Sequence, residues 1–237
     1  DVYKRQDIIN SGVITAEGGE EHGAVGIDVH TSTISGEINN SGIITADDYS
    51  LHIGAKATVT GHVDNSGTLT GGLWLYGTDA IDLDNSGVLD LVDTIDNYIS
   101  GDFDQDGDGE FAFELDLATS YEADEWILTV HGETDLDGLL NVTFADGFSL
   151  NEDDTFQFID VSDGGLTGTF DDLAEGAEIG RSNGYALLIT YDLNDEGDVG
   201  AYVNYVPEPG SMALMATLLA LSLIHISEPT RLLSISY

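Results

Sequence analysis

Short runs of alternating aliphatic and polar residues fill the first 95 positions of the chain. Four such segments align without gaps: IINSGVITA (8–16), INNSGIITA (38–46), VDNSGTLTG (63–71) and LDNSGVLDL (83–91). Each has an aliphatic residue two positions before and four positions after a shared Asn, and even offsets place side chains on one face of a strand. β-branched residues and Thr are frequent in the runs, and a 3.6-residue helical period is not apparent. The pattern predicts short β-strands.

The shared Asn opens an Asn-Ser-Gly triplet that recurs at unequal intervals between residues 10 and 87. Self-similarity of this kind is typical of solenoid proteins. We therefore predict that residues 7–100 form a parallel β-helix (β-solenoid), in which each strand pairs with its equivalent one repeat later. We expect the Asn side chains to form a hydrogen-bonded ladder and the Gly residues to take positive φ at a corner. The residues of this turn ladder are Asn10, Gly12, Asn40, Gly42, Asn65, Gly67, Asn85 and Gly87.

The repeats resemble the passenger β-helices of autotransporter-like surface proteins over about residues 7–95. The resemblance rests on the Asn-Ser-Gly motif and the aliphatic columns around it. It implies an exported protein built from stacked coils. Ligand contact by the repeated Asn residues is the alternative, but a residue that recurs in every repeat is more simply explained by a recurring shape.

The net charge restricts the classes of molecule that we expect the chain to bind. The chain carries 45 Asp and Glu against 5 Lys and Arg, a formal net charge of -40. A field of this sign repels phosphate backbones and anionic lipid surfaces, so we expect no nucleic-acid partner. Disorder is disfavoured because 41% of the residues are hydrophobic. The acidity also fits a saline habitat with no ligand involved. The absence of Cys excludes disulfides and thiolate metal sites.

The densest acidic run lies in an Asp/Gly loop at residues 101–110. Alternating Asp residues around a Gly turn supply the hard oxygen ligands that Ca²⁺ prefers. The EF-hand pattern fails, because position twelve counted from the first ligand is Leu115 and no helical pattern flanks the loop. A simpler calcium turn remains a hypothesis beside an ordinary solvated turn. Its candidate ligands are Asp104, Asp106, Asp108 and Glu110.

Residues 111–205 lack the Asn-Ser-Gly motif but keep the alternating pattern. Further strands are predicted at 126–130, 139–144, 155–161, 185–192 and 199–206, separated by clusters of Asp, Asn and Gly. We interpret this segment as a second β module. It is either the terminal coils of the same solenoid or a β-sandwich-like cap, and a solenoid end needs such a cover.

No pattern of a catalytic site emerges, and we expect no enzyme. Between residues 7 and 221 the only cations are Lys56 and Arg181, which argues against a polysaccharide lyase. With so many carboxylates, no glycosidase pair stands out. The six His residues lack His-x-x-x-His spacing, and we expect most of them on exposed strand positions. The alternative is a carbohydrate-binding or carbohydrate-active (glycoside hydrolase-like) β-helix protein, with Trp74, Tyr76 and Trp126 stacking on sugar rings.

The end of the chain carries a second motif. Val206, Pro207, Glu208 and Pro209 precede an apolar run from Met212 to Leu221. Residues 206–221 resemble the PEP-CTERM sorting signal, shortened and without its Arg cluster. The resemblance implies an exosortase-type processing enzyme as partner and a short C-terminal hydrophobic helix as a transient inner-membrane anchor. It also implies delivery to the surface or extracellular matrix of a Gram-negative bacterium, with exopolysaccharide as a possible partner.

The two ends differ in character from the rest. Residues 1–6 and 222–237 resemble translated adapter sequence from metagenomic assembly, so we expect them to be artefacts and the chain to be a fragment. An ordinary basic start and an ordinary tail are the alternative. Taken together, the sequence favours an all-β, non-catalytic, biofilm- or adhesin-like structural protein that is exported to the cell surface.

Overall fold

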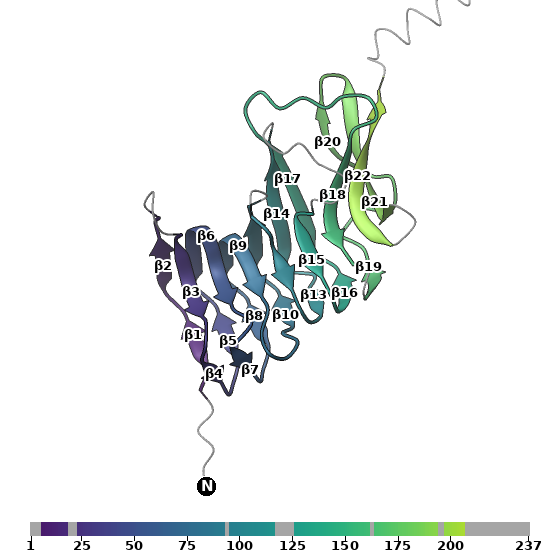
Figure 1. Ribbon diagram of the computed structural model, residues 1–237. Helices are drawn as coiled ribbons and strands as arrows, with labels where there is room; N and C mark the ends of the chain where they lie inside the picture. The colour runs from purple at the N-terminus through teal and green to yellow at the C-terminus, as the bar shows by residue number, and fades with distance from the viewer. Residues whose placement is uncertain are drawn as a thin grey trace, which may run out of the picture. The chain divides into compact units, whose positions relative to one another are not determined.

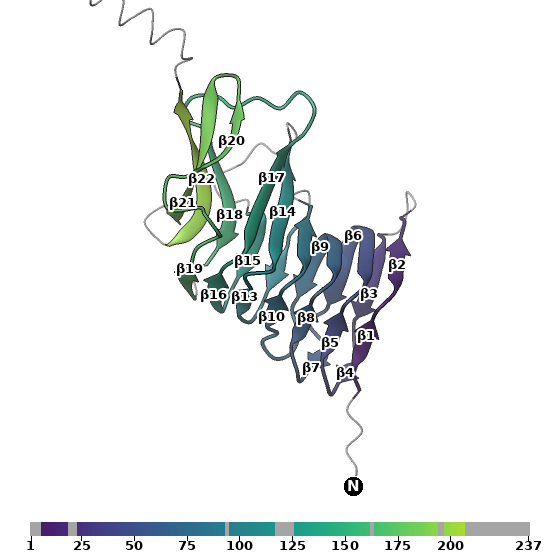
Figure 2. The same cartoon turned by 180° about the vertical axis from the view of Figure 1, so that it is seen from behind.

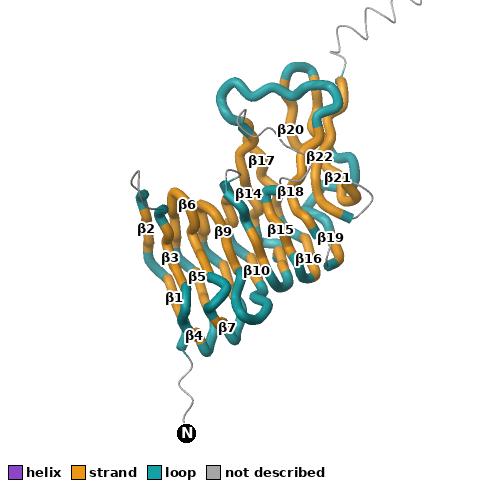
Figure 3. Tube along the Cα trace, in the orientation of Figure 1, coloured by secondary structure: helices purple, strands orange, loops and turns teal. Residues whose placement is uncertain are grey.

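The computed structural model describes residues 6–18, 23–92, 95–116, 126–161, 164–193 and 197–206. In these ranges the chain forms strands, turns and loops and no helix (Figure 3), which confirms the all-β class predicted from the sequence. The expected C-terminal hydrophobic helix lies outside the described residues. No helix able to cross a membrane occurs in the part of the chain that the structure describes.

The strands that end at the corner of each repeat lie side by side in one sheet. It is seven-stranded, in the order β1-β5-β8-β10-β13-β16-β19, and every pair in it is parallel (Figure 1). The register places Asn10 beside Asn40, Asn40 beside Asn65, and Asn65 beside Asn85. The strands are β1 (Ile8–Asn10), β5 (Ile38–Asn40), β8 (Val63–Asn65), β10 (Leu83–Asn85), β13 (Phe103–Gln105), β16 (Glu133–Leu136) and β19 (Gly165–Gly168).

The strands that leave each corner belong to a second, thirteen-stranded sheet. The long strand β6 pairs in parallel with β2 through its first residues and with β3 through its last. β9 likewise pairs with β11 and then with β12. The parallel strands here are β2 (Val13–Ala16), β3 (Val25–Val29), β6 (Ile43–Ile53), β9 (Thr68–Leu75), β11 (Val88–Leu91), β12 (Tyr98–Ile99), β14 (Glu110–Leu115), β15 (Leu128–Val130), β17 (Leu139–Phe144) and β18 (Thr155–Asp160). A separate parallel pair joins β4 (Thr33–Ile34) and β7 (Thr58–Val59).

The parallel pairing continues through the acidic segment 101–110 and beyond it. β10 pairs with β13, and β11 with β14, in the same parallel sense as the earlier repeats. Antiparallel pairing begins later, where β18 meets β22 (Asp198–Tyr205) and β20 (Glu178–Ser182) meets β21 (Tyr185–Leu193). These last strands lie at the opposite end of the sheets from β1 (Figure 2). Residues 111–168 therefore add strands to the sheets that the first repeats begin.

The core is made of columns of side chains from equivalent positions. Ile38, Val63, Leu83 and Phe103 follow one another in register in the seven-stranded sheet and are all buried. In the larger sheet a second column runs through Ile44, Leu69, Leu89 and Phe111. The fifth repeat has Phe in both columns where the earlier repeats have aliphatic residues. Burial of these columns is the main force holding successive repeats together, because apolar burial scales with area.

Candidate functional site

The amides at the corner form a continuous ladder inside the molecule. Nδ2 of Asn10 donates to Oδ1 of Asn40 at 2.8 Å, and Asn40 donates in the same way to Asn65 at 2.8 Å. Asn65 donates to Asn85 at 2.7 Å, and Asn85 donates to Oε1 of Gln105 at 2.8 Å. All five side chains are buried. The four Asn amides donate to one another or to Gln105 and to backbone carbonyls, as buried polar groups usually do, whereas Nε2 of Gln105 has no hydrogen-bond partner. The ladder has a structural role, and its fifth member, Gln105, was not identified from the sequence.

The corner glycines do not take the positive φ that the sequence analysis expected. In the described part of the chain, positive φ occurs at other glycines, and Gly12, Gly42, Gly67 and Gly87 are not among them. The reason for Gly is close stacking. A Cβ on Gly67 would lie 2.0 Å from the carbonyl oxygen of Gly42, and a Cβ on Gly87 would lie 2.1 Å from that of Gly67. Each corner therefore packs backbone against backbone in the next repeat.

The Asp/Gly loop is the fifth corner, widened by two residues. Gln105 pairs with Asn85 and Glu110 pairs with Val88, so four residues connect the strands where two do so in the preceding repeat. A turn closes the insertion, because the Gly109 amide donates to the Asp106 carbonyl at 2.8 Å. The Glu110 carboxylate accepts a hydrogen bond from Asn141 at 2.7 Å.

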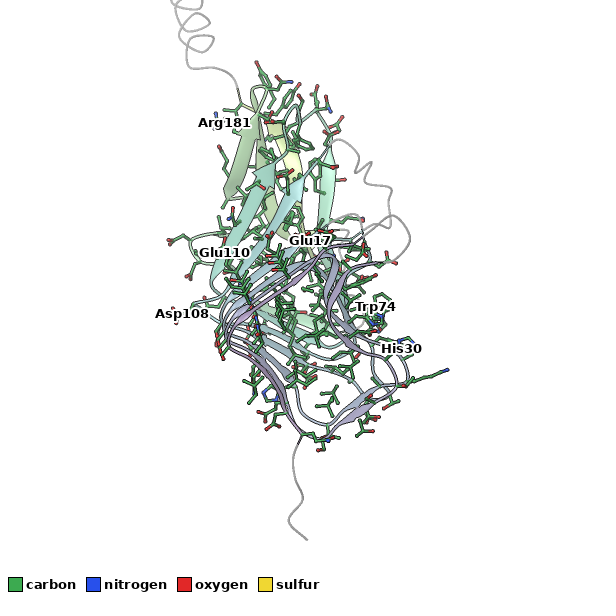
Figure 4. All side chains as sticks on the ribbon, turned by 90° about the vertical axis from the view of Figure 1, so that its left-hand side faces the viewer. Glu17, His30, Trp74, Asp108, Glu110 and Arg181 are labelled. Atoms are coloured by element: carbon green, nitrogen blue, oxygen red, sulfur yellow. The ribbon has the colours of Figure 1, made fainter. Side chains whose placement is uncertain are left out.

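The four candidate calcium ligands do not converge. Two groups of three His, Asp or Glu residues in the described ranges hold ligand atoms within 4.8 Å of one another, and neither group includes Asp104, Asp106, Asp108 or Glu110. Asp108 and Glu110 both project from one edge of the sheets (Figure 4). Calcium binding at this corner stays a prediction.

Asp104 instead belongs to a stripe of carboxylates on the outer face of the seven-stranded sheet. Register places Asp64, Asp84, Asp104 and Asp135 in successive strands, and we call this set the acidic stripe. His62 lies at its start, with Nε2 3.1 Å from Oδ1 of Asp64 and 3.6 Å from Oδ2 of Asp84. A groove of about 490 Å³ follows the stripe, lined also by Asn39, Ser66 and Ser86.

Two carboxylates of the acidic stripe have a raised pKa. Partial burial, followed by the neighbouring charges of Asp106, Asp135 and Asp84, raises the pKa of Asp104. Partial burial is also the main cause that raises the pKa of Asp84, against the opposing effect of His62. Both shifts disfavour the charged form, as expected first from partial burial and then from like charges in register on adjacent strands.

The opposite side of the molecule carries aromatic and His side chains on β6, β9 and β12 and just after β3 and β9. Trp74, Tyr76 and Tyr98 form an aromatic cluster with ring centroids 5.1 to 6.2 Å apart. His131 packs on Tyr98 at 5.1 Å. His30 and Trp74 project from the same side of the sheets, away from Asp108 and Glu110 (Figure 4). Sequence reasoning singled out Trp74 and Tyr76 but missed Tyr98, which register places beside Trp74. Trp126 is half-buried just before β15.

The remaining candidate residues are the two cations in the described part of the chain and the Pro-Glu-Pro motif. Arg181 forms an ion pair with Glu178 at 2.6 Å, and Lys56 is exposed near β7. Val206 follows the last strand, and Pro207, Glu208 and Pro209 lie outside the described residues. Comparison of the chain with protein-family models, with curated proteins and with solved structures found no match.

Proposed function

We propose that the parallel sheets are successive coils of a β-solenoid and that the chain is a non-catalytic structural protein of the bacterial surface or extracellular matrix. The observation that carries this proposal is the in-register stacking of equivalent strands from Ile8 to Gly168. A stacked array of this kind presents the same outer positions at a regular spacing, which suits a scaffold.

The surfaces support a structural role over catalysis. The amide ladder is buried and fully engaged along its first four members, so it is not free to contact a substrate. The acidic stripe repels anionic polymers, and Arg181, which a lyase would need as a charge clamp, is paired with Glu178. A hydrolase needs two carboxylates whose environments separate their pKa values, whereas the pKa of Asp84 and that of Asp104 are both raised, with partial burial as the main cause.

Export is proposed from the sequence motif alone. Under this proposal an exosortase-type enzyme recognises Val206, Pro207, Glu208 and Pro209, and the apolar run after them holds the protein in the inner membrane until processing. The mature protein then resides on the surface or in the matrix of a Gram-negative cell, where exopolysaccharide is the nearest partner and calcium can bridge acidic faces of neighbouring molecules.

Expression in a Gram-negative host with an exosortase system tests the proposal. The intact chain should reach the matrix fraction, whereas a Pro207→Ala/Pro209→Ala variant should remain with the inner membrane. Arg181→Ala, remote from the motif in sequence, serves as the control and should behave as the intact chain. Equal distribution of the intact chain and the double variant would contradict the proposed sorting, and release of sugar from host polysaccharide by the purified chain would contradict the structural role.

Carbohydrate binding is the second candidate, and the aromatic cluster favours it. Trp74, Tyr76 and Tyr98 present adjoining rings on one outer face, and aromatic faces are common contacts for sugar rings. Affinity electrophoresis in gels containing neutral or acidic polysaccharides measures this directly. Trp74→Ala/Tyr98→Ala should remove any retardation, and Tyr202→Ala, an exposed Tyr on β22, should not. Unchanged retardation in the double variant would exclude the cluster as the binding surface.

A further inference from the structure

Three side chains with metal-binding chemistry meet on the outer face of β3 and β6. Asp28 lies directly opposite His52 in the parallel register of these strands. Their neighbours Val29 and Ile53 are buried, so alternation along each strand directs Asp28 and His52 outward. The same alternation directs His30, two residues after Asp28, to the same face. The backbone pairing therefore brings these three residues together.

The side-chain geometry is close to that of a coordination site. Nδ1 of His52 lies 2.9 Å from Oδ1 of Asp28, and the rings of His30 and His52 stack with centroids 6.2 Å apart at 20°. One ligand atom from each of the three residues lies within 4.8 Å of the others. Ligand atoms around a tetrahedral zinc ion are about 3.3 Å apart, so rotation of partly exposed side chains is enough to close the site.

Gly54 keeps room beside the two imidazoles. It follows β6 at the next outward position after His52, and its amide donates to the Val29 carbonyl at 3.0 Å. A Cβ at this position would lie 3.3 Å from Nδ1 of His30 and 3.5 Å from Cε1 of His52. The first distance is a tight contact and the second an ordinary one, so a side chain here would press on the His30 ring and touch the His52 ring. Tyr49 supports His52 from the other side, with ring centroids 5.5 Å apart.

We propose that Asp28, His30 and His52 bind a divalent transition-metal ion of the zinc type. Two imidazole nitrogens and one carboxylate oxygen suit zinc, copper or nickel, whereas calcium and magnesium prefer oxygen ligands alone. Three protein ligands leave a further coordination position open to water or to a donor from another molecule. The net charge of -40 raises the local concentration of every cation, so selectivity for transition metals is what distinguishes this site from general attraction.

A second group, Glu37, His62 and Asp64, serves as the internal comparison. It contains one imidazole, and His62 already contacts Asp64 and Asp84 of the acidic stripe. One imidazole and two carboxylates form a harder ligand set than Asp28, His30 and His52. The first equivalent of zinc should therefore bind at Asp28, His30 and His52.

Calorimetric titration of the full chain with zinc chloride, in excess calcium, tests the proposal. The wild type should bind one tight equivalent, and His30→Ala/His52→Ala should weaken that equivalent by about tenfold or more. His131→Ala, an exposed His on the same sheet, and His62→Ala should retain it. Loss of the tight equivalent in His62→Ala but not in the double variant, or displacement of zinc by calcium, would overturn the proposal.

Imidazole resonances of the wild type give a measurement that does not depend on how the variants fold. On addition of one equivalent of zinc, the ring signals assigned to His30 and His52 should shift or broaden together, before those of His62 and His131. A uniform response of all four, or a first response from His62, would overturn the assignment.

Discussion

At the scale of single residues, the buried amides decide how well one repeat fits the next. Asn65 accepts from Asn40 and donates to Asn85 and to the Val88 carbonyl. Replacement by Ala leaves a buried donor on Asn40 and a buried acceptor on Asn85 without these partners. An unsatisfied buried polar group costs about 1–3 kcal/mol, so Asn65→Ala should lower the free energy of unfolding by about 2–4 kcal/mol in urea titrations. Asn10→Ala, at the end of the ladder, should cost about half as much, and equal losses would argue against a ladder.

Close backbone contact at the corners gives a second prediction. The Cβ of Gly67→Ala would meet the Gly42 carbonyl at 2.0 Å, so the two repeats must separate. Overpacking of this kind costs about 1–3 kcal/mol. Gly165→Ala is the matched control, because a Cβ there has no neighbour within 4 Å. Thermal unfolding should show a lower Tm for Gly67→Ala and an unchanged Tm for Gly165→Ala. A neutral Gly67→Ala would contradict close stacking of the backbone as the reason for Gly at the corners.

One core position, Thr134, carries a buried polar group that lowers stability. Thr134 continues the column that holds Phe103, and its buried hydroxyl has no hydrogen-bond partner. Thr134→Val keeps the shape and removes the unsatisfied group, so it should stabilise the protein by about 1 kcal/mol. Thr167→Val is the control, because its hydroxyl donates to Asp135 at 2.8 Å and is exposed. Chemical denaturation distinguishes the two, and a destabilised Thr134→Val would mean that the hydroxyl has a partner after all.

At the scale of strands and sheets, the acidic stripe makes stability depend on pH. The pKa of Asp84 and of Asp104 is raised in the folded protein, so the folded state binds more protons than the unfolded state between about pH 3.9 and those raised values. In that window stability rises as pH falls. The Tm should therefore increase as the pH falls through this window toward about pH 3.9, as far as these two groups determine it.

Removing the charge of two stripe residues distinguishes the effect of the acidic stripe on stability from the effect of the net charge. Asp84→Asn/Asp104→Asn should be more stable than the wild type at neutral pH and should gain less on acidification. Glu152→Gln, an exposed carboxylate outside the stripe, removes a charge without touching Asp84 or Asp104. If its pH profile changed as much as that of the double variant, the local crowding would not be the cause.

The repeats show which structural elements could be identified from the sequence. Four corners were identified because Asn-Ser-Gly is nearly identical in each. The fifth and sixth were missed because Gln105 and Leu136 occupy the Asn position. A weaker signal was present, since Asp precedes both of these residues as it precedes Asn65 and Asn85. The strands predicted near 139–144, 155–161 and 185–192 coincide closely with β17, β18 and β21.

The candidate sites were harder to predict for a physical reason. Asp28 and His52 are far apart in sequence and become neighbours only through the register of β3 and β6. Tyr98 joins Trp74 in the same way. The Asp/Gly loop is different, because its local pattern predicts a calcium ligand set, which stays a prediction, while the register shows that it also forms a widened corner. Local motifs therefore predicted the corners, whereas residues that are neighbours across strands could be identified only from the structure.

At the scale of the whole molecule, the account depends on equivalent residues lying next to each other across repeats. The chain has no Cys, so pairs of Cys can be introduced without background. Asn39 and Asp64 are register partners on adjacent parallel strands, and both side chains point outward. Strands about 4.8 Å apart allow a disulfide, whereas a separation of about twice that value does not.

The most direct test of this stacking is disulfide formation in three double variants of the full chain. Asn39→Cys/Asp64→Cys should oxidise readily to an intramolecular disulfide, and so should Asp64→Cys/Asp84→Cys. Asn39→Cys/Asp84→Cys, which skips one strand, should stay reduced in the folded protein and oxidise only after unfolding. Ready oxidation of the pair that skips a strand, with none in the adjacent pairs, would contradict the parallel stacking on which the proposed solenoid rests.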